Sequence, residues 1–391
     1  MKYFLLLITT ITFILLFINC TNPQLIDNKT TTAKTTLTNE AALDDKELLK
    51  ITLKIDKLLA KTVKENEPGL AILVAKDSRV IYRKGYGLAN LENETLIKGD
   101  TIFYTASVSK QFTAMAIMML AEAGKLSYDD PLTKFFPKFP DYAKRITVKH
   151  LLYHTSGLPD YIEVFKDKEN ITDSVAVTKK AIEILAKQKE PDFEAGTKHE
   201  YSNSGYLVLA GIVEQASGQS FPEFVKEKIF QPLEMKESFV VTTSRDLPEK
   251  LSRGYKLKNS NYKDVEFGKN SLDLCYGDGG ILTNIQDMYK WDQALYTDKL
   301  VKVDTLKLAF SPGTLDNGEK IDYSDGWGYG FGWAIGDIVG QELITHSGSW
   351  YGWATVIARV PSKNLSVVIF ANTDEIDVSD SSLKIAKMFL K

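Results

Sequence analysis

The sequence predicts an α/β protein of the α+β type, with one central antiparallel sheet built from both ends of the chain and a helical region inserted between them. Two short apolar runs near the N-terminal end, residues 70–75 and 80–82, are separated by a polar turn and predict a β-hairpin. A second pair, residues 353–360 and 365–371, flanks a Pro-containing turn near the C-terminal end. Between these pairs the apolar residues recur mostly at helical spacing.

Helices are expected before the first pair of strands, between the two pairs and after the second pair. The expected helical segments are residues 48–63, 112–123, 175–187, 207–215 and 381–390. We found no internal repeat, and we expect a single domain that runs from residue 46 to residue 391.

The composition is that of an ordinary globular protein. The chain has 391 residues, of which 44% are hydrophobic and 25% are charged, so it can bury a sizeable core. Its 48 basic and 51 acidic residues give a formal net charge of -3 and are interspersed along the chain. Since there is no long basic run or basic helix face, we expect no nucleic-acid partner.

The first twenty residues have the features of an export signal. Lys2 precedes an apolar run, Phe4–Ile18, which is short for a bilayer span but suits a secretory signal. Cys20 follows almost at once, as in a bacterial lipoprotein signal, although Asn19 and Phe17 stand where other residues are usual. We therefore expect residues 1–20 to be a signal with a lipidated Cys20, which places the protein in the cell envelope, attached to a membrane on its periplasmic or extracellular face. An uncleaved N-terminal anchor is the alternative.

Residues 21–45 are expected to be a disordered tether between that lipid and the domain. The segment is polar and rich in threonine, and it has too little apolar content to fold alone. The chain has only one other cysteine, Cys275, so lipidation of Cys20 would rule out a disulfide framework.

The first candidate for chemistry is the Ser-x-x-Lys pattern at Ser107 and Lys110. The same pattern occurs at residues 260–263 and 381–384, but only the first follows an apolar run and opens an amphipathic helix, Gln111–Ala123. Side chains three residues apart are neighbours on a helix, so Lys110 can reach the Ser107 hydroxyl. A serine that merely caps the helix is the alternative.

The second candidate is Tyr201-Ser202-Asn203, which contains the one Tyr-x-Asn sequence in the chain. It lies in a polar loop that enters the helix expected over residues 207–215. Free tyrosine and lysine have pKa values near ~10 and ~10.4, so one of them must shift by about three units to act as a base near neutrality. Placing Tyr201 beside Lys110 is a way to achieve that shift.

Taken together, these blocks resemble the serine β-lactamase and penicillin-binding-protein superfamily, closest to its class C-like branch. That branch includes D-alanyl-D-alanine carboxypeptidases, D-aminopeptidases and esterases. Residues 151–159 (LLYHTSGLP) and 277–283 (GDGGILT) support the resemblance, which covers nearly everything from Lys46 onward. It implies a β-lactamase-like fold, with Ser107 as nucleophile and Lys110 and Tyr201 as its activating partners.

The resemblance also assigns the residues that would bind the substrate. Asn203 would orient Lys110 and the substrate. The family's third element, normally Lys-Thr-Gly on a strand facing the nucleophile, corresponds to His346-Ser347-Gly348. His346 and Gly348 of that element would line the substrate site, and the backbone N–H groups of Ser107 and Ser349 would form the oxyanion hole. Because histidine is only partly charged near pH 7, strong binding of a substrate carboxylate is in doubt.

Other kinds of site are not indicated. There is no His-Glu-x-x-His and no other paired ligand spacing, so we expect no metal and no cofactor. His154 is expected to hold the turn at Ser156-Gly157. No Gly-x-Ser-x-Gly element occurs, which argues against an α/β-hydrolase.

The function expected from these observations is an exported serine hydrolase that forms an acyl-enzyme on ester or amide bonds. The substrate would be a small molecule or peptide, of the cell-wall carboxypeptidase, D-amino-acid peptide or esterase type. A true class C-like β-lactamase is the alternative within the same chemistry. The alternative from a different class is a catalytically silent envelope protein that only binds peptidoglycan or a partner.

Overall fold

The computed structural model describes residues 45–166, 171–245 and 247–390, which belong to one compact unit. The expected signal, the lipidated Cys20 and nearly all of the expected tether lie outside the described residues. None of the helices in these ranges is long and apolar enough to span a bilayer.

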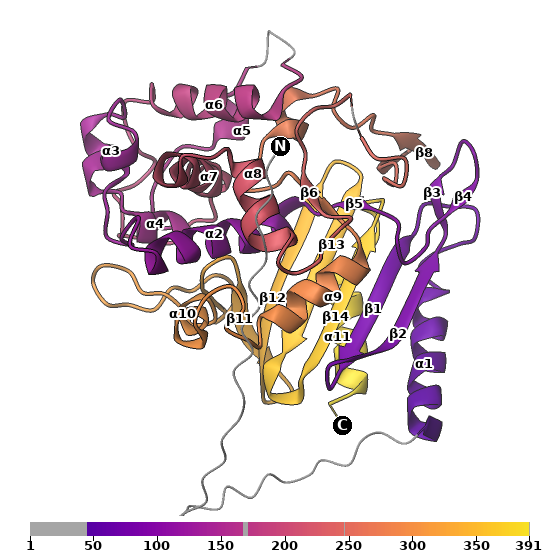
Figure 1. Cartoon of the computed structure of the whole chain (residues 1–391). Coiled ribbons are helices and arrows are strands. Elements are labelled where there is room, and N and C mark those ends of the chain that lie inside the picture. The colour runs from indigo at the N-terminus through magenta and orange to yellow at the C-terminus, as the bar shows by residue number, and fades with distance from the viewer. Residues whose placement is uncertain (1–44, 167–170, 246, 391) are drawn as a thin grey trace, which may run out of the picture. The chain divides into compact units, whose positions relative to one another are not determined.

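The described residues contain a seven-stranded antiparallel sheet that joins both ends of the domain (Figure 1). Its strand order is β10-β11-β12-β13-β14-β1-β2, so the N-terminal hairpin pairs with the last strand of the chain. This confirms the predicted α+β fold. The strands are β1 (Leu70–Lys76), β2 (Arg79–Tyr86), β10 (Gly328–Tyr329), β11 (Ala334–Ile338), β12 (Gln341–Trp350), β13 (Trp353–Val360) and β14 (Leu365–Ala371).

Tight turns connect the paired strands where the sequence predicted them. Asp77 and Ser78, between β1 and β2, have φ values of 52° and 57°, which is the left-handed pair of a type I′ hairpin turn. A short 3₁₀ turn, η5 (Pro361–Lys363), joins β13 to β14 and ends at Asn364, also in the left-handed region. All seven residues of β14 are buried, because helices cover both faces of the sheet.

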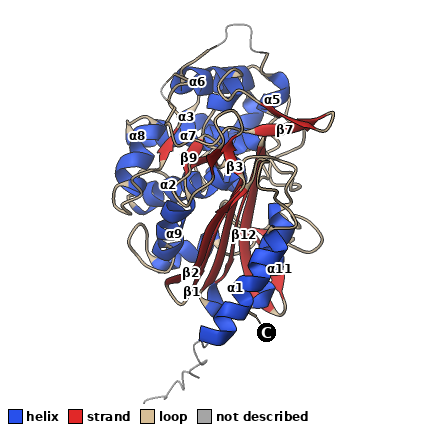
Figure 2. Ribbon diagram, turned by 90° about the vertical axis from the view of Figure 1, so that its right-hand side faces the viewer, coloured by secondary structure: helices blue, strands red, loops and turns tan. Residues whose placement is uncertain are grey.

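Helices from distant parts of the chain form the layers around the sheet. The helices α1 (Asp45–Leu59) and α11 (Val378–Met388) lie against one face (Figure 2). The helix α9 (Ile285–Ala294) packs on the other face, against β1 and β14. In α1, Ile51, Ile55 and Leu59 are buried at helical spacing, which gives that helix its inward face.

The inserted helical region forms a second body beside the sheet (Figure 1). Its helices are α2 (Lys110–Glu122), α3 (Leu132–Phe135), α4 (Val148–Leu152), α5 (Tyr161–Val164), α6 (Ser174–Leu185), α7 (Asn203–Ser217) and α8 (Phe221–Val225). The short turns within or beside it are η1 (Ala106–Ser109), η2 (Asp141–Arg145), η3 (Lys226–Phe230) and η4 (Ser271–Leu274). Another helix, α10 (Val303–Ala309), precedes β10.

Strands of two to four residues form three small sheets outside the main one. They are β3 (Leu88–Asn90), β4 (Thr95–Leu96), β5 (Phe103–Tyr104), β6 (Phe239–Val240), β7 (Tyr255–Lys258), β8 (Asn261–Asp264) and β9 (Ile281–Thr283). β9 pairs with β5 on one side and with β6 on the other. Because β5 leads directly into η1 and α2, this small sheet fixes the entry of α2 into the core.

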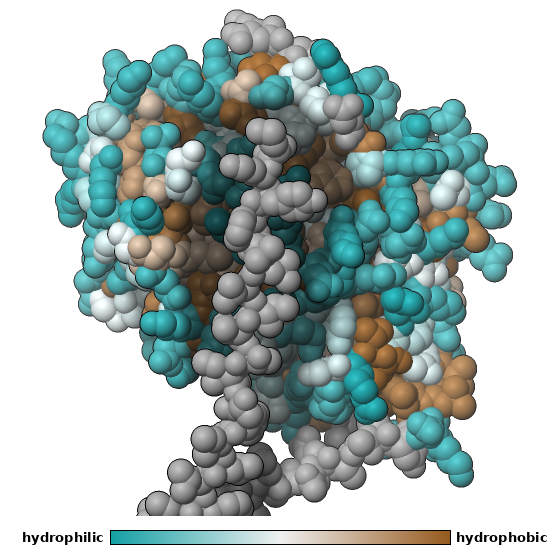
Figure 3. Space-filling model, viewed as in Figure 1, coloured by the Kyte–Doolittle hydropathy of each residue, from teal (hydrophilic) through white to brown (hydrophobic). Residues whose placement is uncertain are grey.

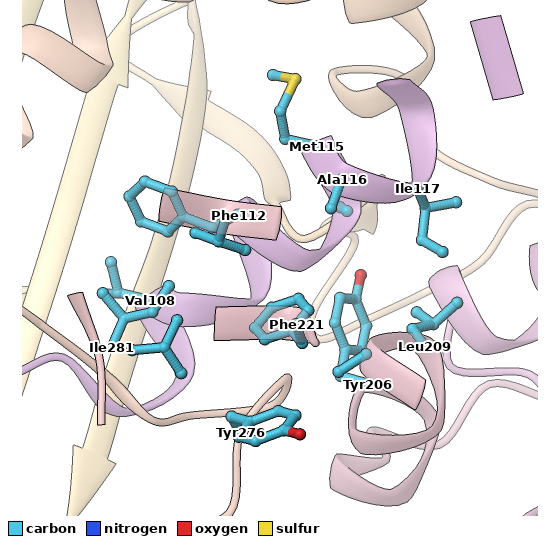
Figure 4. Close-up of a cluster of buried hydrophobic side chains, with 14 of the residues drawn as sticks. Val108, Phe112, Met115, Ala116, Ile117, Tyr206, Leu209, Phe221, Tyr276 and Ile281 are labelled. Carbon is cyan, nitrogen blue, oxygen red and sulfur yellow. The ribbon is translucent and has the colours of Figure 1, made fainter. Parts of the chain in front are cut away.

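The core of the helical region is centred on α2, of which nearly every residue is buried. Its Phe112 packs against Trp291 of α9 with ring centroids 4.2 Å apart. Figure 4 shows how side chains of α2, α7 and α8 converge with those of the segment before β9. Polar side chains cover most of the rim of the molecular face in Figure 3.

Candidate active site

Ser107 lies at the junction of the sheet and the helical region. It belongs to the 3₁₀ turn η1, which continues directly into α2, and it is partly exposed while Val108 and Ser109 are buried. The residue before it, Ala106, has φ 47°, a left-handed conformation that costs a non-glycine residue roughly 1–3 kcal/mol. Thr355 of β13 donates to the Thr105 carbonyl at 2.7 Å and so ties this turn to the sheet.

Lys110 is held by three contacts at its amino group. Its Nζ lies 3.0 Å from Ser107 Oγ, 2.9 Å from Asn203 Oδ1 and 2.9 Å from the Asp278 carbonyl oxygen. The two carbonyl oxygens can only accept, so they take N–H bonds from the lysine. A neutral amine then has its lone pair left for the Ser107 hydroxyl, which is the geometry of a general base.

Burial lowers the pKa of Lys110 to about 8, because the charged form is poorly solvated there. The carboxyl groups of Asp278 and Asp160 oppose this effect and favour the protonated form. A pKa this close to neutrality lets a substantial fraction of the molecules carry the neutral amine at pH 7–8.

Tyr201 lies beside the lysine and keeps its proton. Lys110 Nζ is 4.9 Å from the centroid of the Tyr201 ring. Burial raises the pKa of the Tyr201 phenol well above its usual range, although the neighbouring Ser107 hydroxyl opposes the shift. Of the two groups that the sequence offered as the base, Lys110 is therefore the better suited, and Tyr201 is a neutral donor that can pass a proton onward.

The segment that carries Tyr201 and Asn203 is positioned by a helix cap and a buried histidine. The helix α7 begins at Asn203, earlier than the expected residue 207, because Ser202 caps it by accepting from the Gly205 N–H at 3.1 Å. The Ser202 N–H in turn donates to His154 Nδ1 at 3.0 Å. The expectation that His154 holds the Ser156-Gly157 turn was therefore wrong: this imidazole, 4.4 Å from the Tyr201 ring, supports the Tyr-x-Asn segment.

Strand β12 brings the third sequence element against the nucleophile. A Cβ on Gly348 would lie 2.9 Å from the Ser107 backbone nitrogen and 2.5 Å from the Thr105 carbonyl oxygen. Only glycine lets this strand approach the nucleophile so closely. Ser349 follows on the same strand and lines the same cavity as Ser107. The backbone N–H groups of these two serines are the expected oxyanion donors.

His346 on β12 is buried and neutral. Its Nδ1 lies 2.6 Å from the Ser347 carbonyl oxygen, which can only accept, so this nitrogen carries the proton. The other nitrogen, Nε2, then accepts from the Tyr329 hydroxyl at 2.9 Å. Burial, and next the nearby Lys110, lower the pKa of His346 to about 3. The imidazole therefore offers no positive charge to a substrate at pH 7.

All the residues expected at the site converge on one cavity of about 300 Å³ except Lys110 and Gly348, which lie directly behind its wall. Its wall is made by the following residues: Tyr104, Ala106, Ser107, Tyr161, Tyr201, Asn203, Leu272, Asp278, Gly279, Tyr323, His346, Ser347, Ser349 and Trp350. Among these described residues there is no lysine or arginine. Nor do the described ranges contain a cluster of His, Cys, Asp or Glu suited to a metal ion.

Sequence reasoning missed two residues of this site. Asp278 lies in the glycine-rich segment 277–283, which supports the family resemblance but indicates no role for the Asp278 carboxyl group. Tyr329 lies among alternating glycines and aromatic residues, a pattern that carries no signal for a role in the site. Nothing in the sequence indicated that Tyr329 would fix the tautomer of His346, because the two residues meet only through the pairing of β10, β11 and β12.

A partly exposed serine and a neutral tyrosine line one cavity, and a lysine of lowered pKa lies directly behind its wall. This arrangement defines a site suited to acyl transfer through a serine, without a metal ligand set among the described residues. The chain belongs to the Beta-lactamase family, whose family model matches residues 55–387. This match and the relatives described below place the chain in the serine β-lactamase and penicillin-binding-protein superfamily, as the sequence predicted.

Individual relatives support the same placement. The chain is 34% identical to penicillin-binding protein 4* of Bacillus subtilis (strain 168) over 322 residues, which cover 78% of this chain and 68% of that protein. It is 26% identical to a D-aminopeptidase of Gluconobacter oxydans (strain 621H) over 314 residues, which cover 78% of this chain and 56% of that protein. The structure of the octameric penicillin-binding protein homologue from Pyrococcus abyssi superimposes with a TM-score of 0.74 at 28% identity, over 89% of this chain and 78% of that one.

Proposed function

We propose that this protein is an exported serine hydrolase that cleaves ester or amide bonds through an acyl-enzyme on Ser107. The observation that carries the proposal is the 3.0 Å contact between Ser107 Oγ and the amino group of Lys110, inside a cavity that a substrate can enter. Burying a lysine costs stability, and a silent binding protein has no need for a buried lysine of lowered pKa beside a serine hydroxyl.

In the first step, neutral Lys110 takes the Ser107 proton as the serine oxygen attacks the substrate carbonyl. The backbone N–H groups of Ser107 and Ser349 stabilise the oxyanion, a contribution of about 2.7–4 kcal/mol for each donor. Lys110, now an ammonium, returns the proton through Tyr201 to the departing oxygen or nitrogen. Water then attacks the acyl-enzyme as neutral Lys110 takes its proton, and that proton passes to the Ser107 oxygen as the acyl group leaves.

The substrate class that best fits the cavity is a neutral ester or an amide of a D-amino acid or short D-amino-acid peptide. The absence of lysine or arginine from the described cavity wall, and the neutral His346, leave little to bind a substrate carboxylate. The similarity to a D-aminopeptidase supports the amide alternative. A true β-lactamase is less well supported, because a β-lactam usually requires a cation for its carboxylate.

His346→Lys tests this specificity. A charge at about 4 Å from a substrate carboxylate is worth around 4 kcal/mol at an effective dielectric of about 20, before desolvation. We therefore expect the variant to raise kcat/KM for nitrocefin relative to p-nitrophenyl butyrate by about tenfold or more. The wild type should cleave p-nitrophenyl butyrate and D-alanine p-nitroanilide faster than nitrocefin.

The specificity is tested by measuring kcat/KM for these three substrates in the wild type and the variants. His346→Gln is the matched control, since it changes the side chain without adding a charge, and it should leave the nitrocefin-to-ester ratio nearly unchanged. A wild type that already prefers nitrocefin, or a lysine variant whose ratio does not move, contradicts the specificity proposed here.

We also propose that the protein is anchored to a membrane through lipid on Cys20. The proposal is supported by the apolar run Phe4–Ile18 and by the polar segment after Cys20. Cells grown with a palmitate analogue should label the wild type, and Cys20→Ala should lose the label. Cys275→Ala is the control and should keep it, because Cys275 is buried. A mature protein that begins at another residue would refute this anchoring.

A further inference from the structure

Asp278 is a buried acidic residue at the active site to which the mechanism above gives no role. It lies in the turn before β9 and is 8% exposed. Its Oδ2 accepts from the Tyr161 hydroxyl at 3.1 Å, whereas its Oδ1 has no hydrogen-bond partner among the described residues. A buried carboxylate oxygen without a partner is costly, so its retention calls for an electrostatic reason.

The backbone of the same residue holds the catalytic lysine. The Asp278 carbonyl oxygen accepts from Lys110 Nζ at 2.9 Å, and the neighbouring Gly277 carbonyl accepts from Thr113 of α2 at 2.7 Å. The turn that carries Asp278 is thus fixed to the first turn of α2. The Asp278 carboxyl group belongs to the residue whose carbonyl contacts the lysine, and its charge acts on Lys110 from there.

Among the titratable groups that interact with Lys110 or Asp278, Lys110 is the one that carries a positive charge when protonated near pH 7. The titratable groups that interact with Lys110 are Asp278, Asp160, Tyr201, Tyr206, His154 and His346. Those that interact with Asp278 are Lys110, Tyr161, Asp160, Tyr104, Tyr201 and Cys275. The two histidines are neutral near pH 7, because burial lowers both pKa values. Burial likewise raises the pKa of the tyrosines and of Cys275, which stay protonated.

We propose that the Asp278 carboxylate is a positioning residue for Lys110, supplying the buried negative charge that stabilises the lysine ammonium formed when Ser107 gives up its proton. The proposal rests on the function proposed above. Burial raises the pKa of Asp278, while Lys110 and the Tyr161 hydroxyl oppose that shift and favour the carboxylate. When the serine proton moves to Lys110, the enzyme gains an ammonium in a poorly solvated site, and the nearby carboxylate offsets that cost. The proton then leaves with the departing group, and the carboxylate returns to its resting state unchanged.

The test is the pH dependence of Ser107 acylation, measured as the second-order rate of labelling by a fluorophosphonate between pH 5 and pH 10. In the wild type this rate rises with pH as Lys110 loses its proton. Asp278→Asn removes the charge and keeps the backbone carbonyl that holds Lys110. Without the carboxylate the protonated lysine is less stable, so its pKa falls. We expect the rise in rate to move to lower pH by about one unit, and the plateau to drop because the base is weaker.

Two further variants sharpen the result. Asp278→Ala, which also removes the charge, should move the rise in the same direction. Asp160→Asn should move it less, because Asp160 is partly exposed and solvent screens its charge, while asparagine still caps α5.

The outcomes separate this proposal from the function on which it rests. A uniform loss of rate at every pH, with no movement of the rise, would show that Asp278 has only a structural role and would overturn the proposal. An unchanged profile would show an uncharged Asp278 and would overturn it equally. A wild type that is not labelled at all would refute the proposed function first.

Discussion

Ser107→Ala is expected to abolish covalent labelling by a fluorophosphonate and to lower kcat/KM for p-nitrophenyl butyrate by about 10⁴-fold or more. The substitution removes the oxygen that forms the acyl-enzyme. Ser109, the next serine along the chain, cannot take its place, because it is buried and bonded to Thr105 and to the Ile281 N–H. Residual turnover would come only from the oxyanion donors and from binding.

The chain offers a matched control for this experiment. Ser260 opens a second Ser-x-x-Lys pattern, but it lies in the exposed turn between β7 and β8. Ser260→Ala should therefore label and turn over substrate like the wild type. Thermal unfolding of both variants checks that each is folded. If Ser107→Ala still forms a stable adduct, the nucleophile has been assigned to the wrong residue.

The sequence predicted the sheet well because its strands have strong local patterns. The runs 353–360 and 365–371 match β13 and β14 residue for residue. They are apolar and bounded by a turn, so their strand character does not depend on distant contacts. By contrast, β12 was expected only through resemblance, because the sequence Gln341–Trp350 is polar at several positions and its burial pattern comes from η1 on one side.

The site residues also differ in whether local sequence or tertiary packing brings them together. Ser107 and Lys110 are three residues apart, so local helical geometry was enough to bring them together. Asn203 joins them from 93 positions along the chain and Asp278 from 168 positions. These contacts are created by the packing of α7 and of the turn before β9 on α2. The amino-acid pattern alone shows neither the burial of Lys110 nor the tautomer of His346, since both result from tertiary neighbours.

The cost of that burial explains the unusual surroundings of the lysine. A lysine buried without partners would lose its charge and its position. Here two carbonyl oxygens fix the amino group, and Asp278 with Asp160 offsets part of the desolvation. The pKa of Lys110 consequently stays near neutrality, where it can both take and return a proton in one catalytic cycle.

Lys110→Met should lower the rate of Ser107 acylation by about 10³-fold, because general-base catalysis contributes typically 10²–10⁴-fold. Methionine is close to lysine in length and fills the buried space, so the loss reports the missing amine. In the wild type, kcat/KM should rise with pH and reach half its maximum near the pKa of Lys110, about 8, since only the neutral amine accepts the serine proton. This rise should disappear in Lys110→Met.

Lys110→Arg distinguishes a base from a positive charge. Arginine keeps the charge but does not lose its proton in proteins, so it should be as inactive as methionine if Lys110 is the base. Lys263→Met, in the exposed second Ser-x-x-Lys pattern, is the matched control and should retain the wild-type pH profile. An active arginine variant would assign proton removal to another group, and so would a rise of kcat/KM near pH 8 that persists without Lys110. Tyr201→Phe would then show whether that group is the Tyr201 phenol.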